Sequence, residues 1–103
     1  MRFEWTPQFS ADFSRLTVNE AKMLRKAAKE DFSPACDRYI EDPGQPWPRA
    51  LRVQRMTGTE RVWEMTWSFR GPDGRATFEW VTTGGQARVR WRRIGGYAIF
   101  KNP

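Results

Sequence analysis

Arginine is the residue type in this sequence that is best placed to do chemistry. Alternate positions carry Arg88, Arg90 and Arg92, and Arg75 begins an earlier segment of the same alternating kind. A guanidinium binds phosphate through parallel hydrogen bonds and stacks on nucleobases. It stays charged near neutral pH, so it stabilises negative charge but does not exchange protons. The pattern predicts a surface that binds a polyanion, with nucleic acid as the leading ligand class.

The positive charge lies almost entirely in the second half of the chain. The 103 residues include 18 Lys and Arg against 12 Asp and Glu, a net charge of +6. Residues 1–48 carry seven basic and eight acidic side chains, whereas residues 49–103 carry eleven and four. The first part therefore has a net charge of −1 and the second +7. The alternative interpretation is that arginine serves solubility in a protein whose gene is rich in G and C.

Two scarce residue types exclude whole classes of mechanism. The sequence has no histidine and one cysteine, Cys36, which we expect to be a small core residue. A zinc site of the usual Cys/His type, a Ser-His-Asp triad and a Cys–His pair are therefore excluded. A single thiol and the lack of an apolar leader among the first twenty residues predict a cytoplasmic protein. The apolar runs are too short to cross a membrane.

The first half of the chain is predicted to be a short strand followed by helices. Residues 2–6 alternate between polar and apolar, and residues 8–16 have helical spacing. The pattern Thr17-x-x-Glu20 is a capping box, which predicts the start of a second helix. Ser33-Pro34 indicates a restart of that helix, with the serine as its cap. The segment 42–48 contains three prolines and is predicted to be a stiff connector.

The second half is predicted to be strands joined by turns. Residues 51–56, 61–70, 75–81 and 87–94 are the strands, and residues 57–59, 71–74 and 82–85 are the turns. Together with the first half, this predicts a single α+β domain over residues 1–103, in the order β-α-α-β-β-β-β. Two to three helices should cover one face of a mostly antiparallel sheet of four to five strands. The other face should be open, either as a binding face or as an ordinary solvated one. It should present Glu64, Thr66, Arg75, Thr77, Glu79, Arg88, Arg90 and Arg92.

Several segments taken together resemble the RelE/ParE superfamily of bacterial toxins. The segments are residues 3–7 (FEWTP), 51–58 (LRVQRMTG), 62–65 (VWEM), 74–78 (GRATF) and 89–95 (VRWRRIG). Their order and spacing match over essentially the whole chain. The end of the chain, residues 93–100 (RIGGYAIF), is similar to a subgroup that usually reads RIGxHDIF.

The resemblance implies a RelE-like toxin of a type II toxin–antitoxin pair, with a cognate antitoxin as partner. Many members enter the ribosomal A site and cut mRNA without a metal or other cofactor, by attack of the 2′-hydroxyl on the adjacent phosphate. The resemblance therefore implies a translation inhibitor that acts as a metal-independent mRNA endonuclease on the ribosome. Two alternatives stay open. One is a ParE-like gyrase inhibitor, which acts by protein contact, and the other is a non-catalytic module that binds RNA or protein.

The resemblance also implies roles for particular residues. Arg75 matches the arginine that contacts the scissile phosphate, Tyr97 replaces the histidine of the local motif, and Glu64 and Thr66 stand where some members keep catalytic lysines. Cleavage needs a base, an acid and charge stabilisation. We expect Glu64 or Glu79 as the base, Tyr97 as the acid, and Arg92 and Arg90 beside Arg75. The alternatives are cross-strand ion pairs for the carboxylates and core packing for Tyr97. The expected RNA-binding residues are Arg52, Arg55, Arg88, Arg90, Arg93 and Lys101.

Overall fold

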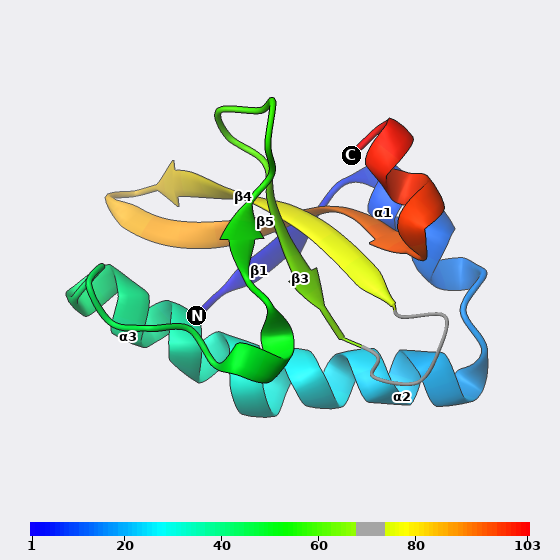
Figure 1. Cartoon of the computed structure of the whole chain (residues 1–103), viewed down its shortest axis with the longest axis horizontal. Helices are drawn as coiled ribbons and strands as arrows, with labels where there is room; N and C mark the ends of the chain where they lie inside the picture. The colour runs from blue at the N-terminus through cyan, green and yellow to red at the C-terminus, as the bar shows by residue number, and fades with distance from the viewer. Residues whose placement is uncertain (68–73) are drawn as a thin grey trace.

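The protein consists mainly of a five-stranded sheet and one long helical rod, residues 18–41, which is made of three consecutive helical segments (Figure 1). The computed structural model describes residues 1–67 and 74–103, without the side chain of Tyr97. Its elements are β1 (Phe3–Trp5), α1 (Pro7–Ser14), α2 (Val18–Lys26), the π-helical segment η1 (Ala27–Phe32), α3 (Ser33–Glu41), the 3₁₀ turn η2 (Arg49–Leu51), β2 (Gln54–Arg55), β3 (Trp63–Thr66), β4 (Arg75–Thr83), β5 (Gln86–Gly95) and the 3₁₀ helix η3 (Tyr97–Lys101).

The sheet brings the first and last strands of the chain together. Its strand order is β1-β5-β4-β3-β2, with β1 parallel to β5 and every other pair antiparallel. Phe3 lies opposite Val89, so the short strand β1 forms one edge of the sheet, next to β5, the longest strand. The α+β architecture and the mostly antiparallel sheet predicted from the sequence are confirmed.

The capping box forms as the sequence predicts, and α3 begins at Ser33 with Pro34 in its first turn, as expected, but Ser33 is not the cap. The Thr17 hydroxyl accepts a hydrogen bond from the Glu20 amide at 3.1 Å, and the Glu20 carboxylate accepts one from the Thr17 amide at 2.9 Å. Ser33 has helical dihedral angles and caps nothing; its amide bonds to the carbonyl of Ala28, five residues back. A proline crowds the carbonyl four residues before it. The wider π-helical turn accommodates Pro34 without ending the rod.

The strands are shorter at β2 and β3 than the alternating pattern indicates. Leu51 lies in the η2 turn and is 1% exposed, so it serves the core rather than a strand that begins there. β3 begins at Trp63, two residues later than predicted. Predicted strand residues 68–70 and turn residues 71–73 lie outside the described part. β4 continues to Thr83, and the turn contracts to Gly84 and Gly85, both with positive φ.

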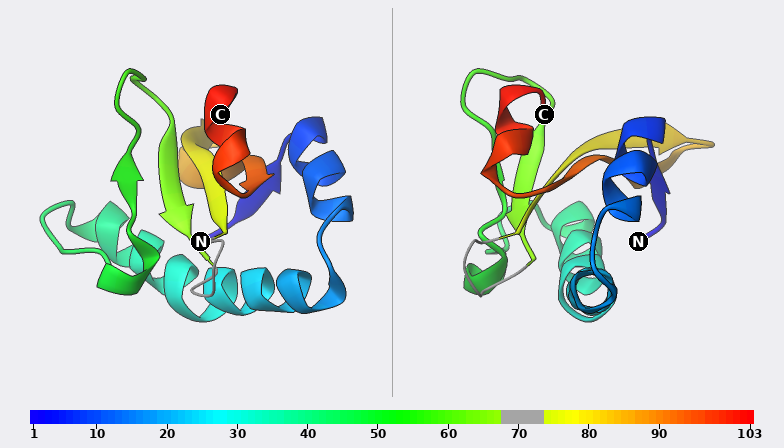
Figure 2. Two further views of the ribbon diagram at one scale, coloured as in Figure 1. Left: turned by 45° about the vertical axis from the view of Figure 1, so that its right-hand side comes forward. Right: turned by 90° about the vertical axis from the view of Figure 1, so that its right-hand side faces the viewer.

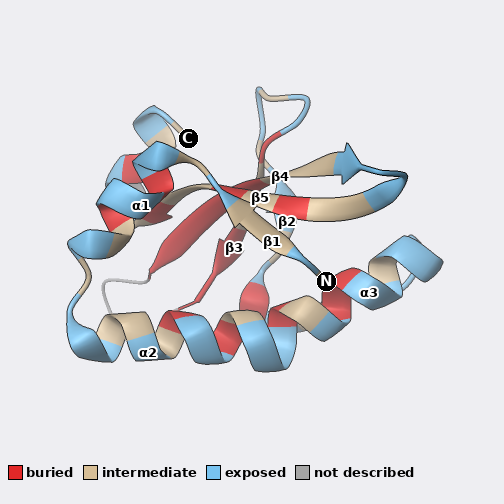
Figure 3. Ribbon diagram, turned by 180° about the vertical axis from the view of Figure 1, so that it is seen from behind, coloured by how far each residue is buried: buried red, intermediate tan, exposed pale blue. Residues whose placement is uncertain are grey.

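Figure 3 shows that the buried positions gather where the helical rod faces the sheet, and aromatic side chains dominate this core. Phe32 of η1 is fully buried, with its ring centroid 5.0 Å from that of Phe78 and 5.1 Å from that of Trp91. Cys36 is also fully buried, as expected, and burial raises the pKa of its thiol. A neutral buried thiol is a poor nucleophile, which fits a packing role.

The face opposite the rod is not the open polar surface expected from the sequence. The η3 helix lies on that side of the sheet (Figure 2). A Cβ atom on Gly95 would lie 3.1 Å from Cγ2 of Ile99, so glycine permits this close approach. Thr66, Arg75 and Thr77, predicted to be exposed, are 2%, 5% and 0% exposed. The η3 helix contacts β4 and β5 on this side, and its buried Ile99 packs beside Gly95, the partner of Arg75.

Candidate functional site

Arg75 begins β4, at the end of the polar face that lies nearest η3. Its Cα partners are Thr66 on β3 and Gly95 on β5. The side chain is buried, and Nη1 lies 3.3 Å from the carbonyl oxygen of Gly74, to which it donates a hydrogen bond. The predicted phosphate contact thus belongs to a buried arginine. Any anion that binds this guanidinium has to reach it beneath or beside η3.

Glu79 joins two of the candidate arginines in an ion-pair ladder. Its Oε1 lies 3.4 Å from Nη1 of Arg90, and its Oε2 lies 3.2 Å from Nη1 of Arg92. Nε of Arg90 also donates to Glu4 of β1 at 2.8 Å, and this hydrogen bond raises the pKa of Arg90. Nε of Arg92 donates to the carbonyl of Pro103 at 3.1 Å. The cross-strand ion pair, one of two interpretations of Glu79, is present.

Glu64 has a different environment from Glu79. It lies opposite Gln54 of β2, and its Oε1 accepts a hydrogen bond from Nε2 of Gln54 at 2.8 Å. It also lies opposite Thr77 on β4, two pairs along from the pair of Thr66 and Arg75 and on the same face of the sheet. The expected base and the expected phosphate-binding arginine are therefore neighbours on one face. Tyr97 contributes the first backbone residue of η3, and its side chain is outside the described part.

A β-bulge in β5 decides where the C-terminal arginines point. Thr77 pairs with Arg93 and Phe78 with Trp91, so Arg92 is the extra residue. A bulge re-aims the side chains around it. Arg92 consequently reaches Glu79, whereas Arg93 reaches α1, where its Nε lies 2.6 Å from Oδ2 of Asp12. Arg93, expected to bind RNA, is thus held by a carboxylate of its own chain.

The remaining predicted RNA-binding residues lie apart from one another. Arg52 is exposed in a left-handed conformation with φ of 48°, and Lys101 is exposed on η3. Arg55 lies over the ring of Trp63, with Cζ 5.4 Å from its centroid. Arg88 is half-buried on β5, and its Nε has no hydrogen-bond partner among the residues that the structure describes. The structure therefore brings Glu64, Arg75, Arg88, Arg90 and Arg92 onto one face of the sheet, whereas Arg52 and Arg55 lie elsewhere.

Sequence reasoning did not single out a groove beside Arg55. Residues of four strands, α3 and the loop before β3 line it, and its volume is about 390 Å³. Arg61 is the basic lining residue missed, because it looked like one more polar position in a predicted strand. The sequence does contain a signal for this groove, because Arg61 stands two residues before Trp63 and so places a positive charge near an aromatic ring.

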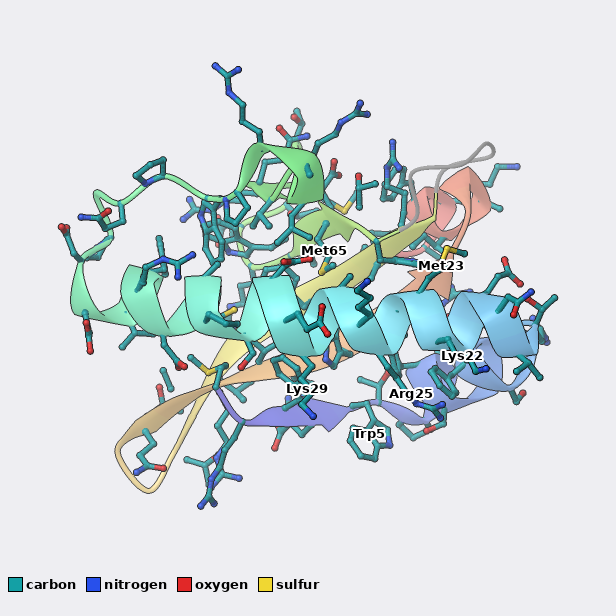
Figure 4. All side chains as sticks on the ribbon, turned by 90° about the horizontal axis from the view of Figure 1, so that it is seen from below. Trp5, Lys22, Met23, Arg25, Lys29 and Met65 are labelled. Carbon is teal, nitrogen blue, oxygen red and sulfur yellow. The ribbon has the colours of Figure 1, made fainter. Side chains whose placement is uncertain are left out.

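A second surface feature lies at the free edge of β1. Trp5 is 61% exposed, and Figure 4 shows it beside the helical rod, which carries Lys22, Arg25 and Lys29. The Arg25 guanidinium lies over Phe13 of α1, with Cζ 5.3 Å from the ring centroid. This edge combines an exposed aromatic ring with basic side chains.

In residues 1–67 and 74–103, no group of three or more His, Cys, Asp or Glu side chains is placed to hold a metal ion. No described helix has both the length and the apolar character needed to span a bilayer.

Comparison with known proteins finds similarity in structure. No protein-family model and no curated protein sequence match the chain. A solved YoeB/ParE toxin from Agrobacterium tumefaciens is similar with a TM-score of 0.58 and 13% identity, over 94% of this chain and 99% of that chain. The intact E. coli RelBE toxin–antitoxin complex is similar with a TM-score of 0.54 and 12% identity, over 92% and 94%. This chain has the RelE/ParE fold. The fold implied by the sequence segments is therefore confirmed from end to end.

Proposed function

We propose that this protein is the toxin of a type II toxin–antitoxin pair and cuts mRNA at the ribosome without a metal ion. The observation that carries the proposal is the RelE/ParE fold over 94% of the chain, shared with a protein described as a toxin. The partners proposed with it are a cognate antitoxin, the ribosome and mRNA. The proposed location is the cytoplasm, where ribosomes and a reduced Cys36 coexist.

The proposed reaction uses the covered polar face around Arg75. The 2′-hydroxyl attacks the adjacent phosphate, and Arg75, with Arg92, stabilises the charge that develops on the phosphate oxygens. Glu64 accepts the hydroxyl proton, and the Tyr97 phenol donates a proton to the leaving 5′-oxygen. Because Arg75 is 5% exposed, the mechanism requires η3 to shift, or the substrate to enter beside it.

A second candidate function is favoured by the ion pairs. Arg90, Arg92 and Arg93, three of the expected phosphate-binding residues, already hold carboxylates of this chain. Guanidiniums that are neutralised internally bind RNA phosphate less strongly. This observation favours a protein that acts by protein contact, either as a ParE-like gyrase inhibitor or as a non-catalytic binding module.

One experiment separates the two candidates. Controlled expression in a bacterial host should arrest growth, and primer extension on mRNA from the arrested cells should reveal new 5′ ends in translated regions. The supercoiling activity of purified gyrase, measured beside it, should not change when the protein is added. Growth arrest with intact mRNA and inhibited supercoiling would favour the gyrase inhibitor instead.

A further inference from the structure

The groove beside Arg55 forms because β4 extends beyond the end of its neighbour β3. β3 pairs with β4 only as far as Trp63 opposite Phe78. From Glu79 to Thr83, β4 is hydrogen-bonded to β5 alone. The chain before β3 turns away through Glu60 and Arg61 and leaves a hollow against this free edge. Side chains from both sheet faces therefore reach the same hollow.

Aromatic rings form one part of the groove lining. Tyr39 of α3 stacks on Trp80, with ring centroids 5.5 Å apart, and meets Trp63 edge-on at 5.8 Å. The Arg55 guanidinium lies over the Trp63 ring, so the lining also includes a planar cation stacked on an indole. A guanidinium plane and an indole ring are the two kinds of surface on which unpaired bases stack.

The polar groups of the groove offer donors more than acceptors. Arg61 is exposed and makes no ion pair with any residue that the structure describes. The Nε1 atom of Trp80 is buried and has no hydrogen-bond partner in that same part of the chain. Two carboxylates, Glu60 and Glu79, also line the groove, and Glu79 is neutralised by Arg90 and Arg92. Because the Trp80 Nε1 atom is buried, a ligand in the groove does not reach it, and the donors open to a ligand are the guanidiniums of Arg55 and Arg61.

We propose that this groove binds one unpaired nucleotide of single-stranded RNA. The base stacks on the outer face of the Arg55 guanidinium, and Arg61 binds a phosphate of the same strand. The volume of about 390 Å³ falls within the range usual for small-molecule sites. The inference rests on the proposed function in that RNA is the ligand, but it assigns a contact that the cleavage chemistry does not need.

The groove and the candidate cleavage site engage different nucleotides. Arg75 and Trp80 are five residues apart on β4, which corresponds to about 16 Å along a strand. One nucleotide therefore does not contact both. The groove holds a base on one side of the scissile phosphate. It therefore contributes to RNA affinity and to the position of the RNA strand, not to the cleavage chemistry.

The test follows the indole signals of the full-length protein by NMR. The protein has six tryptophans, and a Trp80→Phe variant identifies the Trp80 Nε1–H signal by its disappearance. The probe is a short single-stranded RNA with 2′-O-methyl groups, which the protein is unable to cleave. AMP tests whether a free nucleotide suffices, and hexaglutamate tests whether any acidic peptide is accepted. Binding constants come from fluorescence anisotropy of labelled RNA at about 50 mM salt.

We expect the RNA to shift the Trp80 signal and AMP to shift it in the same direction at higher concentration. Arg61→Gln should weaken RNA binding about tenfold, the loss of one charge-assisted hydrogen bond. Arg55→Gln removes the guanidinium on which the base stacks, and should weaken binding about threefold to tenfold. Arg38→Gln, an equal charge change on an exposed α3 residue outside the groove, should leave binding unchanged.

The contrary outcomes separate the two proposals. RNA that binds without shifting the Trp80 signal, and with equal affinity for Arg61→Gln, would overturn the groove and leave the nuclease proposal standing. An equal shift with hexaglutamate would assign the free β4 edge to an acidic protein segment and overturn the nucleotide ligand. A wild-type protein that binds no RNA yet cleaves ribosome-bound mRNA would overturn the groove alone. Absence of both RNA binding and cleavage would overturn both proposals.

Discussion

Asp12 of α1 accepts hydrogen bonds from two nitrogens of Arg93 on β5. Nε of Arg93 lies 2.6 Å from Oδ2 of Asp12, and Nη2 lies 3.1 Å from Oδ1. The amide of Ile94 donates to the same carboxylate at 3.2 Å. Asp12 is 8% exposed, so this arrangement fastens α1 to the sheet at the bulge that directs Arg92 toward Glu79.

Replacing Asp12 should destabilise the fold. Asp12→Asn leaves the Arg93 guanidinium, which is 20% exposed, without its anionic partner. We expect the free energy of unfolding to fall by about 1–3 kcal/mol, measured by urea denaturation at neutral pH. The matched control is Asp37→Asn, an exposed carboxylate on α3, which should cost less than 1 kcal/mol, as is usual for surface ion pairs. Equal losses in the two variants would contradict a special role for Asp12.

The same carboxylate should make stability depend on acid pH. Burial on its own raises the pKa of Asp12, but the hydrogen bonds from Arg93 and Ile94 and the charges of Arg93 and Arg15 outweigh it, so the pKa lies below its ordinary value of 3.8. A carboxyl with a lowered pKa stabilises the folded state above its unfolded pKa and loses that contribution as pH falls through the folded pKa. The stability difference between wild type and Asp12→Asn should therefore be constant above about pH 5 and shrink below pH 3.8.

Neutralising Glu79 should make Arg92 more available for phosphate. In Glu79→Gln, Arg90 keeps Glu4 while Arg92 loses its carboxylate, so more free guanidinium faces solvent. We expect affinity for single-stranded RNA to rise about threefold to tenfold at low salt, and the salt dependence to steepen, because each new phosphate contact releases counterions. Fluorescence anisotropy between about 50 and 200 mM salt measures both. A fall in affinity would contradict this interpretation and make Glu79 a residue that aligns the arginines.

Periodicity predicted the fold well where burial sets the pattern. The alternation of Trp63, Met65 and Trp67 and of Ala76, Phe78 and Trp80 assigned β3 and β4 to one apolar face. Local rules failed where the chain departs from regular spacing. An α-helix does begin at Ser33, as Ser33-Pro34 indicates, but nothing in the sequence pattern indicated the π-helical turn at residues 27–32 before it. This wider turn accommodates the proline without a break.

The candidate site was harder to predict than the fold. Strict alternation along β5 places Arg88, Arg90 and Arg92 on a common face. It does not predict the bulge, which directs Arg93 toward Asp12. It also gives no sign that η3 folds back over Arg75, because that contact joins segments far apart in sequence. Ion pairs such as that of Glu79 with Arg92 depend on register, which the sequence pattern leaves open.

The role of Tyr97 as an acid remains a prediction from the sequence, and a single hydroxyl tests it. Tyr97→Phe keeps the ring, so the melting temperature should hold while cleavage of ribosome-bound mRNA falls about a hundredfold or more. Tyr97→His should retain or raise activity, because imidazole exchanges protons near neutral pH. Wild-type cleavage by Tyr97→Phe, together with a lower melting temperature for Tyr97→His, would assign Tyr97 to packing.

The central claim is that the RelE/ParE fold of this chain cuts mRNA with the help of Arg75. The most direct measurement is the cleavage rate of ribosome-bound mRNA, mapped by primer extension, for wild type, Arg75→Lys and Arg75→Ala. Arg75 is buried, so a thermal melt of each variant must first establish that it folds. We expect wild-type protein to cut within translated codons and Arg75→Ala to be slower by about a hundred- to a thousandfold. Arg75→Lys keeps the charge and should lie between them. An inactive wild-type protein, or a folded Arg75→Ala variant that cuts at the wild-type rate, would contradict the account.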